Sequence, residues 1–62
     1  MIRVAIVDDS RLARLELKEQ LQNQTKFSVV GEAASVADAL ELLATTAIDL
    51  LLLDIEIGRA HV

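Results

Sequence analysis

Three aspartates stand directly after apolar runs, and these positions are the most informative feature of the sequence. Asp8 and Asp9 follow the run Ile2 to Val7. Asp54 follows the run Leu50 to Leu53. Ligands of parallel α/β sheets bind beyond the carboxyl ends of the strands. If the two runs are neighbouring strands, their three carboxylates meet in one pocket.

Three converging carboxylates need a cation or a raised pKa, because two of them about 4 Å apart repel by roughly 4 kcal/mol at an effective dielectric near 20. Oxygen ligands with no His or Cys nearby suit Mg²⁺, which keeps several waters and takes further ligands from a phosphate. One carboxylate of such a pocket can attack phosphorus and form an acyl phosphate. Asp54 stands alone after its run and is the candidate nucleophile.

The composition is that of a small globular segment. The 62 residues are 53% hydrophobic and 26% charged, with one aromatic residue, Phe27, and no cysteine. Disulfides therefore cannot reinforce the core, and the composition suits a reducing cytoplasm. The net charge of −4 argues against contact between this segment and nucleic acid. The N-terminal apolar run is too short to cross a membrane, so no membrane association is expected.

The pattern predicts five elements in the order strand, helix, strand, helix, strand. β-branched apolar runs predict the strands, and helix formers that follow capping residues predict the helices. The four leucines of the last run favour helix by propensity, so that strand is inferred from its shortness and flanking charge. The predicted strands are 2–7, 27–33 and 49–54, and the predicted helices are 10–23 and 35–45. The expected fold class is α/β, a parallel sheet with crossover helices.

Helical spacing also predicts which faces pack. The second helix carries an apolar stripe that is expected to lie on the sheet: Val36, Ala39, Leu40, Leu43 and Ala47. The leucines of the first helix spread over too wide an arc for one buried stripe, so Leu12 or Leu15 is expected to be partly exposed. The charges of that helix are expected to form a solvated mixed face: Arg11, Arg14, Glu16, Lys18 and Glu19. Gly31 predicts a bend or a close backbone approach within its strand.

Taken together, three motifs resemble the N-terminal half of a response-regulator receiver domain. They are Val-Ala-Ile-Val-Asp-Asp-Ser-Arg-Leu-Ala-Arg, Val-Val-Gly-Glu-Ala and Asp-Leu-Leu-Leu-Leu-Asp-Ile, in this order and over about residues 1 to 55. The resemblance implies a flavodoxin-like doubly wound parallel sheet with strand order 2-1-3. It implies a phosphoacceptor module of a two-component system, not an enzyme. It also implies Mg²⁺-dependent transfer of a phosphoryl group from a sensor histidine kinase.

The same resemblance implies roles for individual residues. Asp54 is then both the phosphoacceptor and a metal ligand, Asp9 a direct Mg²⁺ ligand, and Asp8 an acid that acts mainly through metal-bound water. The main-chain carbonyl of Glu56 completes the protein ligands. The helix that begins near Ser10 is similar to the kinase-docking surface of receivers, which makes Leu12 and Leu15 candidate docking residues. The stretch from Asp9 to Arg14 looks most like the LytR/AlgR type, in which a separate output domain binds DNA.

The sequence departs from the receiver pattern after Glu56. Receivers are about twice as long, and their fourth and fifth strands supply a Ser or Thr and a Lys that contact the phosphoryl group. The last six residues, Ile-Gly-Arg-Ala-His-Val, resemble the translation of a common sequencing adapter. We therefore expect residues 1–56 to be the N-terminal half of a receiver and residues 57–62 to be a non-native tail. On this view the isolated 62-residue chain is incomplete and inactive.

Three alternatives remain open at this stage. In a Walker B strand of a P-loop ATPase, Asp54 would hold Mg²⁺ and Glu56 would activate water, but no GxxxxGK[ST] loop precedes them. A haloacid-dehalogenase-like phosphatase places its Asp-x-Asp motif after the first strand, not at Asp54. A receiver-like module that binds partners without phosphorylation is disfavoured by the presence of all three acids.

Overall fold

A computed structural model describes residues 1–54 of the chain. It contains five elements in the predicted order: β1 (Ile2–Val7), α1 (Arg11–Gln22), β2 (Phe27–Ala33), α2 (Val36–Thr45) and β3 (Leu50–Leu53). Two strands have the predicted bounds, and the third is one residue shorter at each end than predicted. The prediction of five elements is confirmed.

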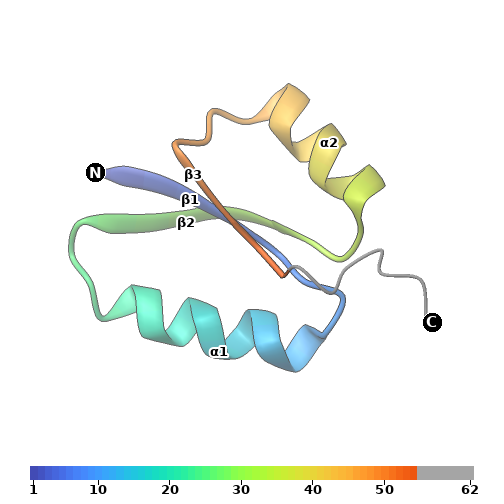
Figure 1. Ribbon diagram of the computed structural model, residues 1–62. Helices are drawn as coiled ribbons and strands as arrows, with labels where there is room; N and C mark the ends of the chain where they lie inside the picture. The colour runs from blue at the N-terminus through green and yellow to red at the C-terminus, as the bar shows by residue number, and fades with distance from the viewer. Residues whose placement is uncertain (55–62) are drawn as a thin grey trace.

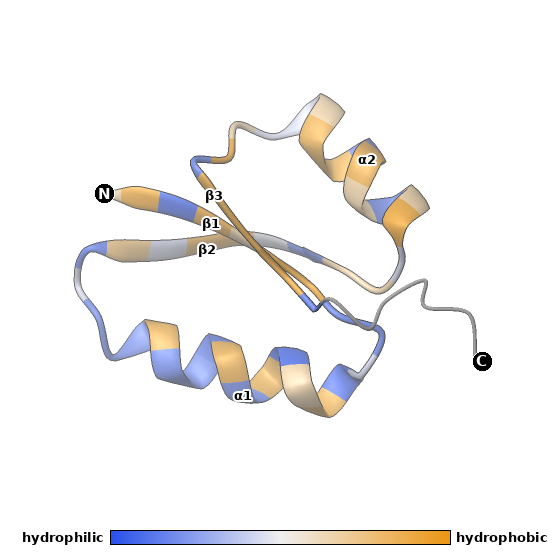
Figure 2. Cartoon of the chain, in the orientation of Figure 1, coloured by the Kyte–Doolittle hydropathy of each residue, from blue (hydrophilic) through white to orange (hydrophobic). Residues whose placement is uncertain are grey.

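The three strands form one parallel sheet with the order β2-β1-β3, as predicted. The helices α1 and α2 lie on opposite faces of this sheet (Figure 1). The central strand β1 is covered on both faces, and its residues Val4 to Val7 are completely buried. A strand in this position must be apolar on both sides, which explains the unbroken run in the sequence. Figure 2 shows the resulting hydrophobic band along β1 and β3.

Serine side chains cap both helices. The hydroxyl oxygen of Ser10 accepts a hydrogen bond from the N–H of Ala13 at 3.2 Å, and that of Ser35 accepts one from the N–H of Asp38 at 3.1 Å. Each bond satisfies a main-chain donor that the first turn of a helix leaves unpaired. The Ser10 cap fixes where α1 begins and therefore confines the aspartate pair to the short turn after β1.

Gly31 combines the two features that its position predicts. The pairing of β1 with β2 shifts register between Val4 and Ala5, which face Val29 and Gly31, so Val30 is the extra residue of a bulge. A Cβ atom on Gly31 would lie 2.7 Å from Leu42 Cδ1. The absence of a side chain at Gly31 thus lets α2 approach the sheet through Leu42.

The predicted packing face of α2 is wrong at four of its five residues. Ala39 is buried and packs with Val7 and Ala33, but Val36, Leu40 and Leu43 are 50%, 63% and 45% exposed, and Ala47 is also exposed. The helix is rotated so that Ala39 and Leu42 approach the sheet, whereas the other four residues of the predicted stripe do not. The space opened by Gly31 accounts for this rotation, because it accepts the Leu42 side chain.

The prediction for the leucines of α1 is confirmed. Leu12 is 65% exposed and Leu15 is 49% exposed, whereas Leu17 and Leu21 are partly buried. Two large apolar side chains of α1 are therefore exposed on the described part of the chain and can be contacted from outside it.

Candidate functional site

The three predicted aspartates come together at the carboxyl edge of the sheet. The N–H of Asp54 donates to the carbonyl of Val7 at 2.9 Å, which places the end of β3 beside the end of β1. One carboxylate oxygen from each of Asp8, Asp9 and Asp54 lies within 4.8 Å of the others. The adjacency of the two strands, which the sequence could only suggest, is what gathers these acids.

Asp8 is held at three points. Its N–H donates to the Ala33 carbonyl at 3.0 Å, its carboxylate accepts from the Ser10 N–H at 2.8 Å, and its carbonyl accepts from Arg14 Nη1 at 2.7 Å. Asp8 is also the most enclosed of the three acids, at 8% exposed, whereas Asp9 is exposed. The site therefore pairs a fixed, buried carboxylate with a solvent-facing one.

A hollow of about 300 Å³ adjoins the acids. Asp8 and Asp54 line it together with the apolar side chains of Leu17, Leu52 and Leu53. Apolar walls beside converging carboxylates lower the local dielectric and strengthen the attraction between those carboxylates and a cation. The hollow is open to solvent and large enough for a small phosphorylated group to approach.

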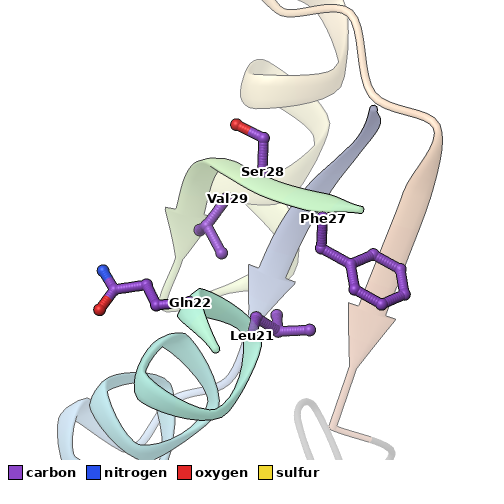
Figure 3. Close-up of a pocket in the computed structure, with 5 residues that line it drawn as sticks. All are labelled: Leu21, Gln22, Phe27, Ser28 and Val29. Atoms are coloured by element: carbon purple, nitrogen blue, oxygen red, sulfur yellow. The ribbon is translucent and has the colours of Figure 1, made fainter. Parts of the chain in front are cut away.

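A second hollow lies between α1 and β2 (Figure 3). Its lining residues carry no ionisable side chain: Leu21, Gln22, Phe27, Ser28 and Val29. This composition offers no acid, base or metal ligand. Within the described residues, the candidate catalytic and metal-binding groups therefore lie at the acidic edge and not in this second hollow.

Arg14 and Lys18 do not form the solvated face that the sequence predicts. Arg14 Nε lies 2.8 Å from Glu32 Oε1, and Lys18 Nζ contacts Glu32 Oε2. The hydrogen bonds from Lys18 and then from Arg14 hold the pKa of Glu32 below its ordinary value. The prediction holds for Arg11, Glu16 and Glu19, which are exposed, and fails at Arg14 and Lys18 because Glu32 projects from β2 toward α1. A single carboxylate within an apolar strand, together with two cations spaced i, i+4, is the signal that could have revealed the cluster.

Some predicted features lie outside the described residues. They are the Glu56 carbonyl as a metal ligand and the non-native origin of residues 57–62. Both stay predictions.

The chemistry of the donor set fits Mg²⁺. The described residues 1–54 contain neither His nor Cys, and the three clustered ligands are all carboxylates. Hard divalent cations prefer such oxygen ligands, and Mg²⁺ commonly binds one or two carboxylates together with waters and a phosphate. An acidic cluster beside a hollow that can hold water and phosphate matches this coordination preference of Mg²⁺.

Comparison with known proteins decides the family. The profile of the response regulator receiver domain matches residues 4–61 of the chain. The chain belongs to this family. This membership agrees with the α/β fold and with the acidic edge, and it decides against the ATPase and phosphatase alternatives.

Several curated relatives resemble this receiver segment. The sensory transduction protein LytT of Bacillus cereus is 44% identical over 58 residues, which are 94% of this chain and 24% of LytT. The transcriptional regulatory protein BtsR of Escherichia coli is 39% identical over 59 residues, 95% of this chain and 25% of BtsR. A protein-glutamate methylesterase/protein-glutamine glutaminase of Hydrogenovibrio crunogenus is 43% identical over 58 residues, 94% of this chain and 15% of that enzyme. No solved structure matches the chain significantly.

The receiver segment spans about a quarter of the length of LytT and BtsR. These two relatives are a sensory transduction protein and a transcriptional regulator by name, which agrees with the predicted LytR/AlgR type. Within the described residues, neither helix is long and apolar enough to cross a membrane.

Proposed function

We propose that this receiver segment accepts a phosphoryl group on Asp54 from a sensor histidine kinase of a two-component system, in a reaction that requires Mg²⁺. The observation that carries the proposal is the convergence of Asp8, Asp9 and Asp54 within 4.8 Å in a chain of the receiver family. The sheet brings these three positions together, and carboxylates placed there repel one another unless a cation binds.

The surroundings of the acids support separate roles. One carboxylate oxygen of Asp8 already accepts the Ser10 N–H, which suits an acid that meets the metal through water. Asp9 is exposed and is the proposed direct ligand. Bound Mg²⁺ would supply charge neutralisation for the phosphoryl oxygens. The Glu56 carbonyl completes the proposed ligand set.

Asp54 provides the nucleophile. A carboxylate oxygen of Asp54 forms a bond to phosphorus while the P–N bond of the kinase phosphohistidine breaks. The departing imidazole nitrogen keeps the electron pair and takes a proton from solvent.

The proposal includes a wider context for the full-length protein. This segment receives a phosphoryl group and is not itself an enzyme; enzymatic activity in a methylesterase relative is a property of that protein. A DNA-binding output domain in the full-length protein is proposed from similarity to BtsR, a transcriptional regulator. The segment itself makes no nucleic-acid contact, because its net charge is −4. Its proposed location is the cytoplasm.

The test is phosphorylation of the full-length natural protein with acetyl phosphate and Mg²⁺. Mass spectrometry should find one added phosphoryl group in the wild type and none in Asp54→Asn. The matched control is Asp49→Asn, which removes an acid at the other end of β3 and should be labelled like the wild type. Equal labelling of Asp54→Asn would overturn the assignment. A wild type that is never labelled would favour a receiver-like module that binds partners without phosphorylation.

A further inference from the structure

The Arg14 side chain joins the acidic edge to the ion cluster between α1 and β2. Its Nη1 donates to the main-chain carbonyl of Asp8 at 2.7 Å, and its Nε donates to Glu32 Oε1 at 2.8 Å. Only 15% of the Arg14 side chain is exposed. One planar guanidinium group therefore holds two acceptors from different elements in a fixed relative geometry.

We propose that Arg14 is a positioning residue for the metal site, and that Glu32 holds it in place. We call this pair the Arg14–Glu32 clamp. The clamp acts on the peptide group between Asp8 and Asp9. That group is planar, so fixing the Asp8 carbonyl also fixes the orientation of the Asp9 N–H and the direction in which the chain leaves each residue. The clamp thereby fixes the directions in which the side chains of Asp8 and Asp9 extend toward the pocket. The part of this inference that concerns metal rests on the proposed function.

The other two contacts of Asp8 cannot replace the clamp. The Ala33 carbonyl binds the Asp8 N–H, on the side of the residue away from Asp9. The Ser10 N–H binds the Asp8 carboxylate and so depends on the turn that the clamp orients. Among the described hydrogen bonds of Asp8, the bond from Arg14 is the one that a partner residue donates from its side chain. A substitution at Arg14 can therefore remove this bond without changing the main chain.

Charge and positioning predict opposite effects of removing Arg14. A cation near an acidic pocket repels a bound metal, so loss of the Arg14 charge alone should strengthen metal binding. Loss of positioning should weaken it, as groups that orient metal ligands typically contribute 10–100-fold in affinity. Lys18 supplies a matched control, because it pairs with the same carboxylate as Arg14 but donates no hydrogen bond to Asp8. The sign of the change therefore separates the two effects.

The first measurement is Mn²⁺ binding to the full-length natural protein by electron paramagnetic resonance. Arg14→Met should bind Mn²⁺ about tenfold more weakly than the wild type. Lys18→Met should bind it as tightly as the wild type or more tightly. Arg14→Lys keeps the charge and one donor, so it should recover part of the lost affinity; it also serves if Arg14→Met folds poorly. Wild-type or tighter Mn²⁺ binding by Arg14→Met would overturn the positioning role.

The second measurement needs no metal. Hydrogen exchange of the Ser10 amide reports the bond to the Asp8 carboxylate, and it should be faster in metal-free Arg14→Met than in the wild type or Lys18→Met. Unchanged Ser10 exchange would contradict the clamp. If the wild type binds no Mn²⁺, the proposed metal site fails, while Ser10 exchange still decides whether the clamp orients Asp8.

Discussion

The main-chain N–H of Asp54 is hydrogen-bonded to the carbonyl of Val7 at 2.9 Å. Val7 immediately precedes the aspartate pair. This hydrogen bond therefore places the candidate nucleophile directly beside the candidate metal ligands. Their separation is set by the parallel register of β3 on β1, in which Leu53 pairs with Val7. A rigid main-chain connection between the acids means that substitutions of their side chains test electrostatics with little change in geometry.

Asp9→Asn should stabilise the metal-free full-length protein and weaken its binding of Mg²⁺. Asp9 is exposed, so the relief of repulsion is near the aqueous value of about 1 kcal/mol for charges 4 Å apart. Excess Mg²⁺ should reverse the order of stabilities, because a ligand that binds only the native state stabilises it by RT ln(1 + [L]/Kd), which is larger for the tighter-binding wild type. Urea unfolding with EDTA and with Mg²⁺ measures both effects. Asp38→Asn on α2 is the control, and the idea fails if the two variants respond alike to Mg²⁺.

The ion pair between Arg3 and Asp49 predicts a pH dependence of stability. Arg3 Nε lies 3.0 Å from Asp49 Oδ2, and the side-chain hydrogen bond from Arg3 is the main reason that the pKa of Asp49 falls to about 2 from an ordinary value of 3.8. A lowered pKa in the folded state adds stability that is fully present above the ordinary pKa and is lost as the pH falls toward the folded one. Its contribution should therefore disappear between pH 3.8 and about 2.

Urea unfolding of wild type and Asp49→Asn across that pH range tests the prediction. The difference in urea midpoint between the two should be constant at and above about pH 5 and should shrink toward zero near the pKa of the folded state. The pair is exposed to solvent, so added salt should also reduce the difference. A difference that stays constant down to the lowest pH would show that Asp49 acts through something other than its charge.

Local patterns were sufficient to predict the elements of this fold. Ile2 to Val7 and Phe27 to Ala33 have the predicted bounds, because Asp8 ends the first apolar run and Lys26 precedes the second. The four leucines of β3 form a strand despite their helix propensity, since pairing with β1 determines their conformation. The order of the strands came from the resemblance to receivers, because the rules for crossover connections fix their handedness but not which strands are neighbours.

Contacts between elements were beyond local patterns. The rotation of α2 depends on the space above Gly31, and periodicity alone does not state which neighbouring element lacks a side chain. The contacts of Arg14 and Lys18 with Glu32 likewise depend on how α1 sits across β2. The three acids were predicted because strand ends in a parallel sheet share an edge, whereas the hydrogen bond from Arg14 to Asp8 depends on where α1 lies relative to the turn after β1.

Gly31→Ala should destabilise the protein through Leu42. The new Cβ would lie 2.7 Å from Leu42 Cδ1 and 3.3 Å from Leu42 Cγ, so the leucine must change rotamer or α2 must shift. Overpacking of this kind costs roughly 1–3 kcal/mol, and the flexible leucine end favours the lower value. A double-mutant cycle with Leu42→Ala checks the cause, because Gly31→Ala should cost much less in that background. Equal costs in both backgrounds would assign the effect to the β-bulge instead.

Leu15→Asp should impair phosphoryl transfer from the kinase while sparing the chemistry of the site. Leu15 is 49% exposed and Leu12, one turn earlier on α1, is 65% exposed. An exposed apolar pair of this kind is suited to an interface, and a buried unpaired charge at its centre typically costs at least 2 kcal/mol in binding. Transfer from the phosphorylated kinase at limiting receiver concentration should therefore slow by at least about tenfold.

Acetyl phosphate provides the comparison that isolates docking, because it reaches Asp54 without a protein surface. Leu15→Asp should be labelled by acetyl phosphate at the wild-type rate, and its urea midpoint should change little because Leu15 is half exposed. Gln20→Asp introduces the same charge at another exposed position of α1 and should leave both donors unaffected. Equal slowing with both donors would show that Leu15 supports the acidic edge from within the domain. Equal slowing of kinase transfer by Gln20→Asp would instead assign the effect to charge along the whole helix, which the docking role of Leu15 does not allow.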